Sequence, residues 1–331
     1  MKDKKLTMGD IAKIAGVGKS TVSRYFNGGY IKEDTKIKLK KVIDEYHYEP
    51  NAIAQSLKAK YSKQIGIVVP CLDSVTSSRV MMSMDQYLKE HGYTAIIMNT
   101  NHDELRELTS IEQLSRMNVD GIILMATHVT MAHQKIASKL DIPLLFVAQQ
   151  YNLGYSIVND DYKAGYDVGV YAAKQGHKNI CYMGVSQKDE AVGVIRKKGV
   201  IAGLKDNGVE HIDILEVNFS FEKAHDSAYE YLKNKQPTLI ICATDNIALG
   251  CLKAIQEKGL STPNDISLIG FGGYEISTYM SPSLTTIRFE NEETGKKAGA
   301  TIIKLIEGET IDKLQLIGYQ MKEGKSVKSM N

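Results

Sequence analysis

The side chains best suited to chemistry lie in one short run, Lys19-Ser20-Thr21-Val22-Ser23-Arg24. If this run is helical, Val22 and Phe26 lie four residues apart and face inward, so that the polar side chains face outward. An arginine can make two hydrogen bonds to the edge of a guanine, and hydroxyl groups bind bases or phosphates. The run therefore predicts a surface that contacts a nucleic acid. Its outward side chains are Lys19, Ser20, Ser23 and Arg24.

Two short helices must position that surface. Thr7 followed by Asp10 resembles a capping box, with Asp in place of the usual Glu, and predicts a helix over about residues 8–15. Gly16 permits a tight turn, and residues 19–26 form the second helix. Two short helices joined by a glycine-containing turn are typical of the helix-turn-helix, whose second helix enters the major groove of DNA.

The distribution of charge agrees with a nucleic-acid partner. Residues 1–60 contain 13 Lys and Arg against 7 Asp and Glu, whereas the rest of the chain contains 28 against 32. A basic segment on a mildly acidic body predicts that the segment meets a polyanion. Residues 33–46 predict a third helix, and residues 51–59, with Asn51 as N-cap, predict a fourth that is too short to be stable alone.

The rest of the chain alternates between strand and helix patterns. Apolar, β-branched runs such as residues 65–69 are typical of buried parallel strands, and amphipathic stretches separate most of them. This alternation predicts parallel sheets covered by helices, and so many strands in about 270 residues favour two sheets. The polar residues 322–331 predict a loose end. The expected strands are residues 65–69, 94–98, 121–125, 144–147, 156–158, 180–184, 214–217, 239–242 and 267–271, and the expected helices include residues 81–91, 107–117, 162–175 and 246–258.

Missing patterns argue against several classes of protein. The sequence contains no run of about eighteen apolar residues, which a membrane span would need. The N-terminus also lacks the apolar core of a secretion signal, so we expect a cytoplasmic protein. The four cysteines form no CxxC pair and predict core thiols, with no metal or other cofactor. The sequence contains neither a Gly-x-Ser-x-Gly motif nor a His-Glu-x-x-His motif, so neither of these patterns predicts an enzyme. Gly18-Lys19-Ser20-Thr21 resembles a phosphate-binding loop, but Lys13 stands where that loop needs glycine.

Residues 15–24 and residues 48–57 are two sequence motifs whose combination, at this spacing along the chain, is highly specific. Together they resemble the lactose-repressor/galactose-repressor (LacI/GalR) family of bacterial transcription regulators. The resemblance continues through nearly the whole chain. Its further segments are residues 158–165, 176–177, 242–250, 263–271 and 282–287.

The resemblance implies a particular division of the chain. A small all-α helix-turn-helix DNA-binding domain would occupy residues 1–60, with a hinge helix at residues 51–59. An α/β periplasmic-binding-protein-like domain, used for ligand binding and dimerisation, would occupy residues 61–331. This second domain would consist of two discontinuous subdomains with parallel sheets, and the chain would cross between them near residues 160 and 290. Ligands of such folds bind near the carboxyl ends of strands and between domains.

The resemblance also implies DNA contacts. Three residues match positions that read base edges: Lys19, Ser20 and Arg24. Four others suit phosphates, which position a protein without specifying sequence: Thr7, Thr21, Ser23 and Asn27. In the hinge helix that Asn51 begins, Ala54 and Leu57 match residues that enter the minor groove, where Leu57 would act as a wedge between bases. From its residue type alone, Leu57 is an ordinary packing leucine.

Candidate ligand contacts follow from the same resemblance. A sugar needs hydroxyl partners and an apolar or aromatic face. The matching positions are Asp160, Arg196, Phe219 and either Thr244 or Asp245. Simpler roles stay open, because Asp160 could be a helix N-cap, Arg196 a solvated helix residue and Phe219 plain core.

Two further ligand contacts are expected from loops. The loop over residues 70–78 is rich in hydroxyls, which favours a hydroxylated ligand over a flat base, and Ser74 is its candidate contact. Gly272 stands where family members often carry an aspartate, so that Glu275 is the candidate replacement.

These observations together predict a DNA-binding transcriptional repressor of a carbohydrate-utilisation operon. It would be a homodimer that binds a pseudo-palindromic operator in double-stranded DNA and is released by a small sugar, with sucrose or trehalose as the leading guess. Three alternatives stay open: a ligand that strengthens DNA binding, a partner protein as effector, and a cytoplasmic sugar-binding protein.

Overall fold

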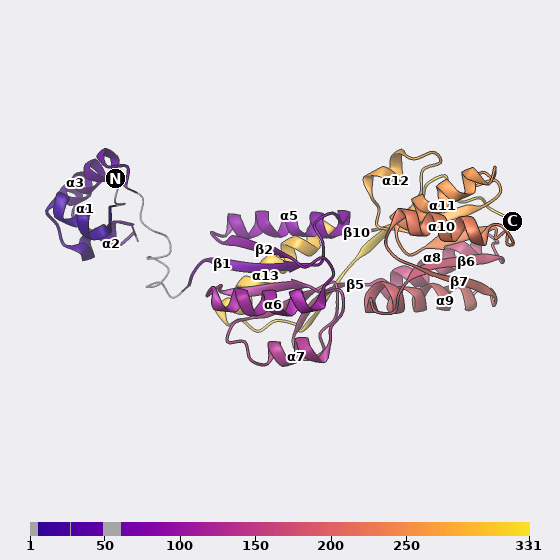
Figure 1. The fold of residues 1–331 in the computed structure, drawn as a ribbon, viewed down its shortest axis with the longest axis horizontal. Coiled ribbons are helices and arrows are strands. Elements are labelled where there is room, and N and C mark those ends of the chain that lie inside the picture. The colour runs from indigo at the N-terminus through magenta and orange to yellow at the C-terminus, as the bar shows by residue number, and fades with distance from the viewer. Residues whose placement is uncertain (1–5, 27, 49–60) are drawn as a thin grey trace. The chain divides into compact units, whose positions relative to one another are not determined.

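The computed structural model describes residues 6–26, 28–48 and 61–331 (Figure 1). Contacts within the chain divide it into two units, Met1–Lys63 and Gln64–Asn331. The described residues of the first unit form only α-helices and their connections, and the second is an α/β unit with two sheets, so the predicted fold class is confirmed. In the described part of the chain, no helix is both long and apolar enough to cross a membrane.

The first unit contains α1 (Met8–Ala15), α2 (Lys19–Phe26) and α3 (Glu33–Glu45). The predicted capping box is present, because the backbone N–H of Thr7 donates to Asp10 at 2.9 Å and that of Asp10 donates to the Thr7 hydroxyl at 3.3 Å. Gly16 ends α1 with a φ of 62°, a left-handed conformation that favours glycine. The small core holds Ile11, Ala12, Ala15, Val22, Leu39 and Tyr48.

Two six-stranded sheets form the second unit. The first has the order β11-β5-β4-β3-β1-β2 and is parallel throughout. The second has the order β12-β10-β9-β8-β6-β7, with only β12 antiparallel to its neighbour. The strands are β1 (Gln64–Val69), β2 (Thr94–Asn99), β3 (Gly121–Met125), β4 (Leu144–Val147), β5 (Tyr155–Asn159), β6 (Ile180–Val185), β7 (Ile212–Val217), β8 (Leu239–Cys242), β9 (Ser267–Phe271), β10 (Thr285–Phe289), β11 (Leu314–Ile317) and β12 (Tyr319–Lys322).

Helices cover the two sheets (Figure 1). The first sheet with α5 (Val75–Glu90), α6 (Glu104–Arg116), α7 (Met131–Ala137) and α13 (Asn291–Glu307) is called the first lobe. The second sheet with α8 (Asp161–Lys174), η1 (Glu190–Arg196), α9 (Lys197–Lys205), α10 (Phe221–Tyr231), α11 (Asp245–Glu257) and α12 (Glu275–Tyr279) is called the second lobe. The core of each lobe consists of apolar residues of the strands and of the helices packed on them.

The chain passes between the lobes three times. It leaves the first sheet after β5, returns from β10 into α13, and leaves again between β11 and β12. The first two passages lie next to Asp160 and Glu290, and the third, at Gly318, was not predicted. Neither lobe is therefore built from one continuous stretch of chain.

The prediction of a loose C-terminal end is wrong. The Ser326 side chain is buried, and its hydroxyl donates to the Leu268 carbonyl at 2.6 Å. The Leu268 N–H donates in turn to the Ser326 carbonyl at 2.8 Å. His177 Nε2 lies 3.0 Å from the carbonyl oxygen of Lys328. The polar end is ordered because its hydrogen bonds are made to the second lobe rather than to water.

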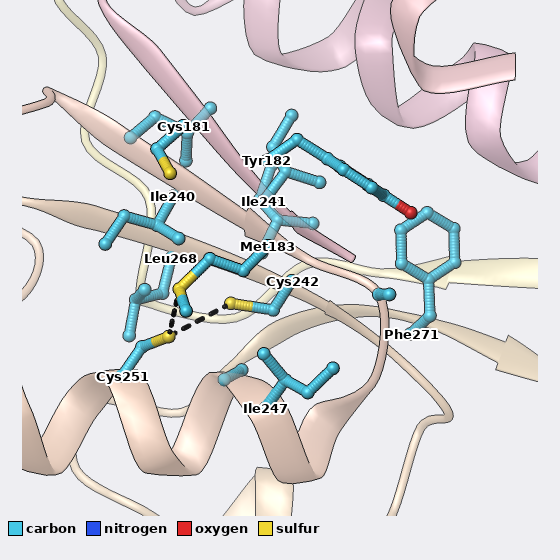
Figure 2. Packing of buried hydrophobic residues seen from close by; sticks show 14 of the residues in the cluster. Cys181, Tyr182, Met183, Ile240, Ile241, Cys242, Ile247, Cys251, Leu268 and Phe271 are labelled. Carbon is cyan, nitrogen blue, oxygen red and sulfur yellow. Dashed lines mark hydrogen bonds between the residues drawn. The ribbon is translucent and has the colours of Figure 1, made fainter. Parts of the chain in front are cut away.

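Three of the four cysteines are core thiols, as predicted. Cys181, Cys242 and Cys251 are buried in the second lobe, where the Cys251 thiol lies 3.6 Å from Cys242 Sγ and 3.1 Å from Met183 Sδ (Figure 2). Burial raises the pKa of Cys181 to about 12, which keeps that thiol protonated. Cys71 departs from the prediction, because it is only half-buried and lies beside a cavity.

Candidate functional site

A cavity of about 400 Å³ lies between the two lobes of the second unit. The first lobe contributes residues that follow β1, β3 and β4, and the second lobe contributes residues that follow β8 and β9. The cavity thus lies at the carboxyl ends of parallel strands, where this kind of fold places its ligands. Its size suits a small molecule of one or two rings.

Arg196 supplies a cation in the wall of this cavity, and the residue is 5% exposed. It ends the π-helix η1, a type of helical turn often found at functional sites. Its Nε and Nη2 donate to Oδ1 of Asp161 at 2.8 and 2.6 Å, and Nη1 donates to the Ala243 carbonyl at 2.6 Å. The alternative of a solvated helix arginine is therefore wrong.

Aromatic rings and a carboxylate hold the guanidinium in its charged form. Its Cζ lies 4.9 Å from the ring centre of Phe271 and 5.0 Å from that of Phe289. Burial acts to lower the pKa of Arg196, but the neighbouring Asp161 carboxylate outweighs it, so the pKa is raised. Burial raises the pKa of Asp161, and the guanidinium opposes that shift. The pair is a desolvated ion pair inside the cavity wall.

Close packing of α8 against α9 brings these two charges together. A Cβ on Gly165 would lie 2.3 Å from the Arg196 carbonyl oxygen, and one on Gly199 would lie 2.2 Å from that of Tyr162. Real side chains do not fit at such distances, so the two helices approach this closely only with glycine at both positions. The short approach places Asp161, at the start of α8, within reach of Arg196 at the start of α9.

Four of the predicted ligand contacts lie in the cavity wall: Ser74, Arg196, Phe219 and Thr244. Phe219 is 38% exposed, so it is not plain core. Ser74 and Thr244 are the N-caps of α5 and α11, where their hydroxyls accept the N–H groups of Ser77 and Ile247.

The other three predicted contacts lie outside the wall. Asp160 is the N-cap of α8, and its Oδ1 accepts the Lys163 N–H at 3.1 Å. Glu275 is exposed at the start of α12. Asp245 is buried and accepts the Tyr274 N–H at 2.9 Å. Two further hydrogen bonds to Asp245 come from the hydroxyls of Ser277 and Thr286, at 2.7 and 2.5 Å.

Asp245 therefore acts on the cavity indirectly. Burial raises the pKa of its carboxyl, and the hydrogen bonds from Thr286, Tyr274 and Ser277 oppose the shift. These bonds fix the turn that follows β9 and carries the Tyr274 ring into the wall. Tyr274 Oη lies 3.4 Å from the Thr76 hydroxyl of the first lobe.

A second contact across the cavity joins the lobes through side chains that the sequence analysis did not single out. The Gln149 amide nitrogen, following β4, donates to Oδ1 of Asp189 at 3.0 Å. The Ala191 N–H donates to the Gln149 amide oxygen at 3.2 Å. Gln149 and Asp189 both line the cavity, as does Asp161. Their position after strand ends and at helix starts was the signal that could have identified them.

A more open hollow of about 750 Å³ lies beside β7 and α10. Its wall carries charged side chains such as Asp213, Lys223 and Glu230. The hollow is lined by residues within the outer strand β7 and on α10, rather than by residues that follow the ends of several parallel strands. The cavity between the lobes is the better candidate for a ligand site, because it lies at the carboxyl ends of the parallel strands.

The helix-turn-helix presents its own surface on α2. Val22 is buried beneath the helix, whereas Lys19, Ser20 and Arg24 are exposed. The predicted phosphate contacts Thr21 and Ser23 are half-buried. Thr7 is exposed, but its hydroxyl already donates to Asp10 at 2.6 Å. Four predicted DNA contacts lie outside the described residues: Asn27, Asn51, Ala54 and Leu57.

Comparison with known proteins agrees with this arrangement. Residues 7–51 match the sequence model described as bacterial regulatory proteins of the lacI family. Residues 62–323 match periplasmic binding proteins and the sugar binding domain of the LacI family. The chain belongs to the LacI family. The family resemblance noted in the sequence is thereby confirmed.

Curated relatives match this LacI-family chain over almost their whole length. A sucrose operon repressor from Staphylococcus xylosus is 34% identical, over 94% of this chain and 97% of the relative. An HTH-type transcriptional repressor PurR from Vibrio atlanticus is 30% identical, over 98% and 99%. Catabolite control protein A from Priestia megaterium is 28% identical, over 93% and 94%.

Solved structures share the fold of this LacI-family protein. The lac repressor dimer bound to operator and an anti-inducer has a TM-score of 0.91 at 24% identity, covering 98% of this chain and 100% of the other. The transcriptional regulator CelR in complex with cellobiose has a TM-score of 0.74 at 20% identity, covering 97% and 99%. At these identities the likeness concerns the fold alone.

Proposed function

We propose that this protein is a cytoplasmic, sequence-specific DNA-binding repressor of a carbohydrate-utilisation operon, released from its operator by a small sugar. The observation that carries this proposal is the presence, in one chain, of an exposed Lys19, Ser20 and Arg24 surface on α2 and a cavity between two lobes. The first supplies DNA contacts, and the second supplies a ligand site whose lobes can move against each other.

Relatives support a sugar as the effector. The Staphylococcus xylosus relative is named a sucrose operon repressor, and a solved structure with the same fold holds cellobiose. We therefore favour a disaccharide of the sucrose or trehalose type. In the cavity, Ser74, Thr244 and Arg196 would bind its hydroxyls, and Phe219 would lie against a ring face. We further propose that the bound sugar is not turned over, since this is a family of regulators.

The proposed mechanism couples the cavity to the DNA. Residues 1–60 would bind DNA, with residues 51–59 as a hinge helix, and residues 61–331 would bind the sugar and form a homodimer. Each copy would read one half of a pseudo-palindromic operator, with Ala54 and Leu57 in the minor groove at its centre. A sugar that prefers a different arrangement of the lobes would separate the hinge helices and weaken operator binding.

The decisive experiment measures binding to a fluorescent duplex from the protein's own promoter region, with and without a panel of sugars. Salt must be held constant because phosphate contacts make DNA affinity steeply salt-dependent. We expect one sugar to weaken operator binding at least about tenfold, which corresponds to about 1.4 kcal/mol of coupling. Tight operator binding that no sugar changes would refute the sugar effector and leave a partner protein as the alternative. A sugar that strengthens binding would identify a co-repressor.

A further inference from the structure

The charged side chains in the cavity wall are mostly acidic. Asp73, Asp161 and Asp189 line the cavity. Arg196 also lies in the wall, but its charge is already neutralised by the Asp161 carboxylate at 2.6–2.8 Å. The wall also holds an exposed histidine, His102. The guanidinium, which in isolation would attract an anion, is thus committed to an internal ion pair. The two remaining carboxylates, Asp73 and Asp189, have no matching lysine or arginine in the wall.

Helix starts around the cavity would ordinarily favour an anion, because the first turn of a helix carries a partial positive charge. The starts of α5, α8, η1, α10 and α11 each contribute a residue to the wall. Four of them carry an acidic side chain of the chain itself in the first turn: Asp161, Glu190, Glu222 and Asp245. The fifth, α5, follows Asp73 by two residues. These carboxylates already occupy the favourable field at the helix starts.

The wall also needs hydrogen-bond donors from its ligand. Both hydrogen bonds from Arg196 to Asp161 end on Oδ1, so within the described residues Oδ2 of Asp161 accepts no hydrogen bond. The Thr127 hydroxyl, also in the wall, is buried without a hydrogen-bond partner there. A sugar hydroxyl donates to a carboxylate, whereas an ionised phosphate offers acceptor oxygens and one to two negative charges near neutral pH.

We propose that this cavity selects an uncharged, polyhydroxylated ligand and rejects the phosphorylated form of the same sugar, with Asp161 and Asp189 as the specificity-determining residues. The inference rests on the proposed function, because it concerns the effector of the same site. It adds a chemical class: the effector is a free sugar rather than a sugar phosphate.

Calorimetric titration of the full chain with matched pairs of sugars tests this proposal. The pairs are sucrose and sucrose 6-phosphate, trehalose and trehalose 6-phosphate, and glucose and glucose 6-phosphate, in a buffer free of phosphate and sulfate. For every pair that binds, we expect the neutral member to bind at least about tenfold more tightly. A phosphorylated member that binds as tightly as its partner, or more tightly, would overturn the inference while leaving a sugar-controlled repressor intact. Binding by neither member of any pair would overturn both.

Variants assign the selectivity to the two carboxylates. Asp161→Asn keeps an oxygen that can accept from Arg196 but leaves the positive charge of Arg196 without a neutralising partner. The ratio of the affinity for the neutral sugar to that for the phosphorylated sugar should therefore fall at least about tenfold. Asp189→Asn keeps the acceptor for the Val192 N–H and removes a second charge, and should lower the ratio independently. Asp312→Asn removes the same charge at an exposed position outside the cavity and should leave the ratio unchanged. A ratio that neither cavity variant lowers would refute the role assigned to these residues.

Discussion

The Gln149 amide donates a hydrogen bond of 3.0 Å to the carboxylate of Asp189, and the two side chains belong to different lobes. This contact can form only at one separation of the lobes. Together with the contact between Thr76 and Tyr274, it stabilises the arrangement seen here. Any ligand that prefers another arrangement must break these contacts, so they contribute to the coupling between sugar and DNA.

Replacing Gln149 should therefore change both binding affinities. Loss of a hydrogen bond to a charged group costs about 1.5–3 kcal/mol, and Gln149→Ala should disfavour this arrangement by an amount of that order. If the sugar releases the operator, sugar and operator affinities should move in opposite directions, measured by titration of each. Movement in the same direction would indicate co-repression, and unchanged affinities would refute the assigned role. Gln134→Ala, on the exposed side of α7, is the matched control.

Arg196→Ala should reduce stability strongly. The change leaves Asp161 as an unpaired buried charge, which typically costs about 3–5 kcal/mol, and urea unfolding at pH 7 measures this loss. Arg116→Ala removes the exposed pair with Glu112 and should cost under about 1 kcal/mol. The folded fraction of Arg196→Ala should still bind the operator but no longer respond to the sugar. An unchanged sugar response would show that the cavity is not the effector site.

Arg24→Ala should separate DNA binding from sugar binding. An arginine that makes two hydrogen bonds to a guanine contributes about 1–3 kcal/mol of discrimination, so the variant should lose that much preference for the operator over unrelated DNA. Competition binding at fixed salt measures the preference, and calorimetry should show unchanged sugar affinity. Lys139→Ala removes a positive charge from the second unit and should affect neither. Equal losses on operator and unrelated DNA would identify Arg24 as a phosphate contact instead.

His177 should make stability fall at acidic pH. Burial lowers the pKa of its imidazole, although the hydrogen bond to the Lys328 carbonyl opposes the shift. The unfolded chain therefore takes up a proton at His177 below about pH 6.5, where the folded chain resists it. The free energy of unfolding therefore keeps its full value above that pH and decreases as the pH falls below it. Between pH 7.5 and pH 5, His177→Gln should lose less stability than the parent, whereas the exposed variant His211→Gln should match the parent.

Cys71 offers a direct probe of cavity occupancy. It lines the cavity and is half-buried, whereas the other three thiols are buried. Burial raises the pKa of Cys71, so alkylation by iodoacetamide should be slow at pH 7 and measurable at pH 8.5. A saturating effector sugar should slow the labelling of Cys71, followed by mass spectrometry. Labelling at an unchanged rate with sugar bound would place the sugar elsewhere.

The sequence predicted nine of the twelve strands of the second unit and missed β10, β11 and β12. All nine expected strands are present within two residues of their predicted ends, because buried parallel strands are continuous apolar runs. The edge strands β11 and β12 were missed because polar residues alternate with apolar ones in them, and Leu316 of β11 is 54% exposed. The inner strand β10 was also missed, because two threonines and an arginine interrupt its apolar pattern. The ordered end around Ser326 was missed because its hydrogen-bond partners come from distant parts of the chain.

For one candidate ligand contact, the sequence pointed to Asp160, the neighbour of the residue that lies in the cavity wall. Asp160 and Asp161 are adjacent carboxylates, and only the backbone decides which caps α8 and which turns toward Arg196. Sequence position identified Arg196 through its family match, but not the partner that neutralises it. Gln149 and Asp189 carry no pattern of their own, because their importance arises only when the two lobes face each other.

The three passages between the lobes have a consequence for how the chain folds during its synthesis. The first sheet needs β11 beside β5, and the second needs β10 beside β9 and β12 beside β10, so each sheet stays incomplete until residues beyond 310 have left the ribosome. The helix-turn-helix needs only residues 7–48 and can form while the rest is being made. At about 5–20 residues per second, a nascent chain would carry a folded DNA-reading helix well before it has a complete cavity to control it.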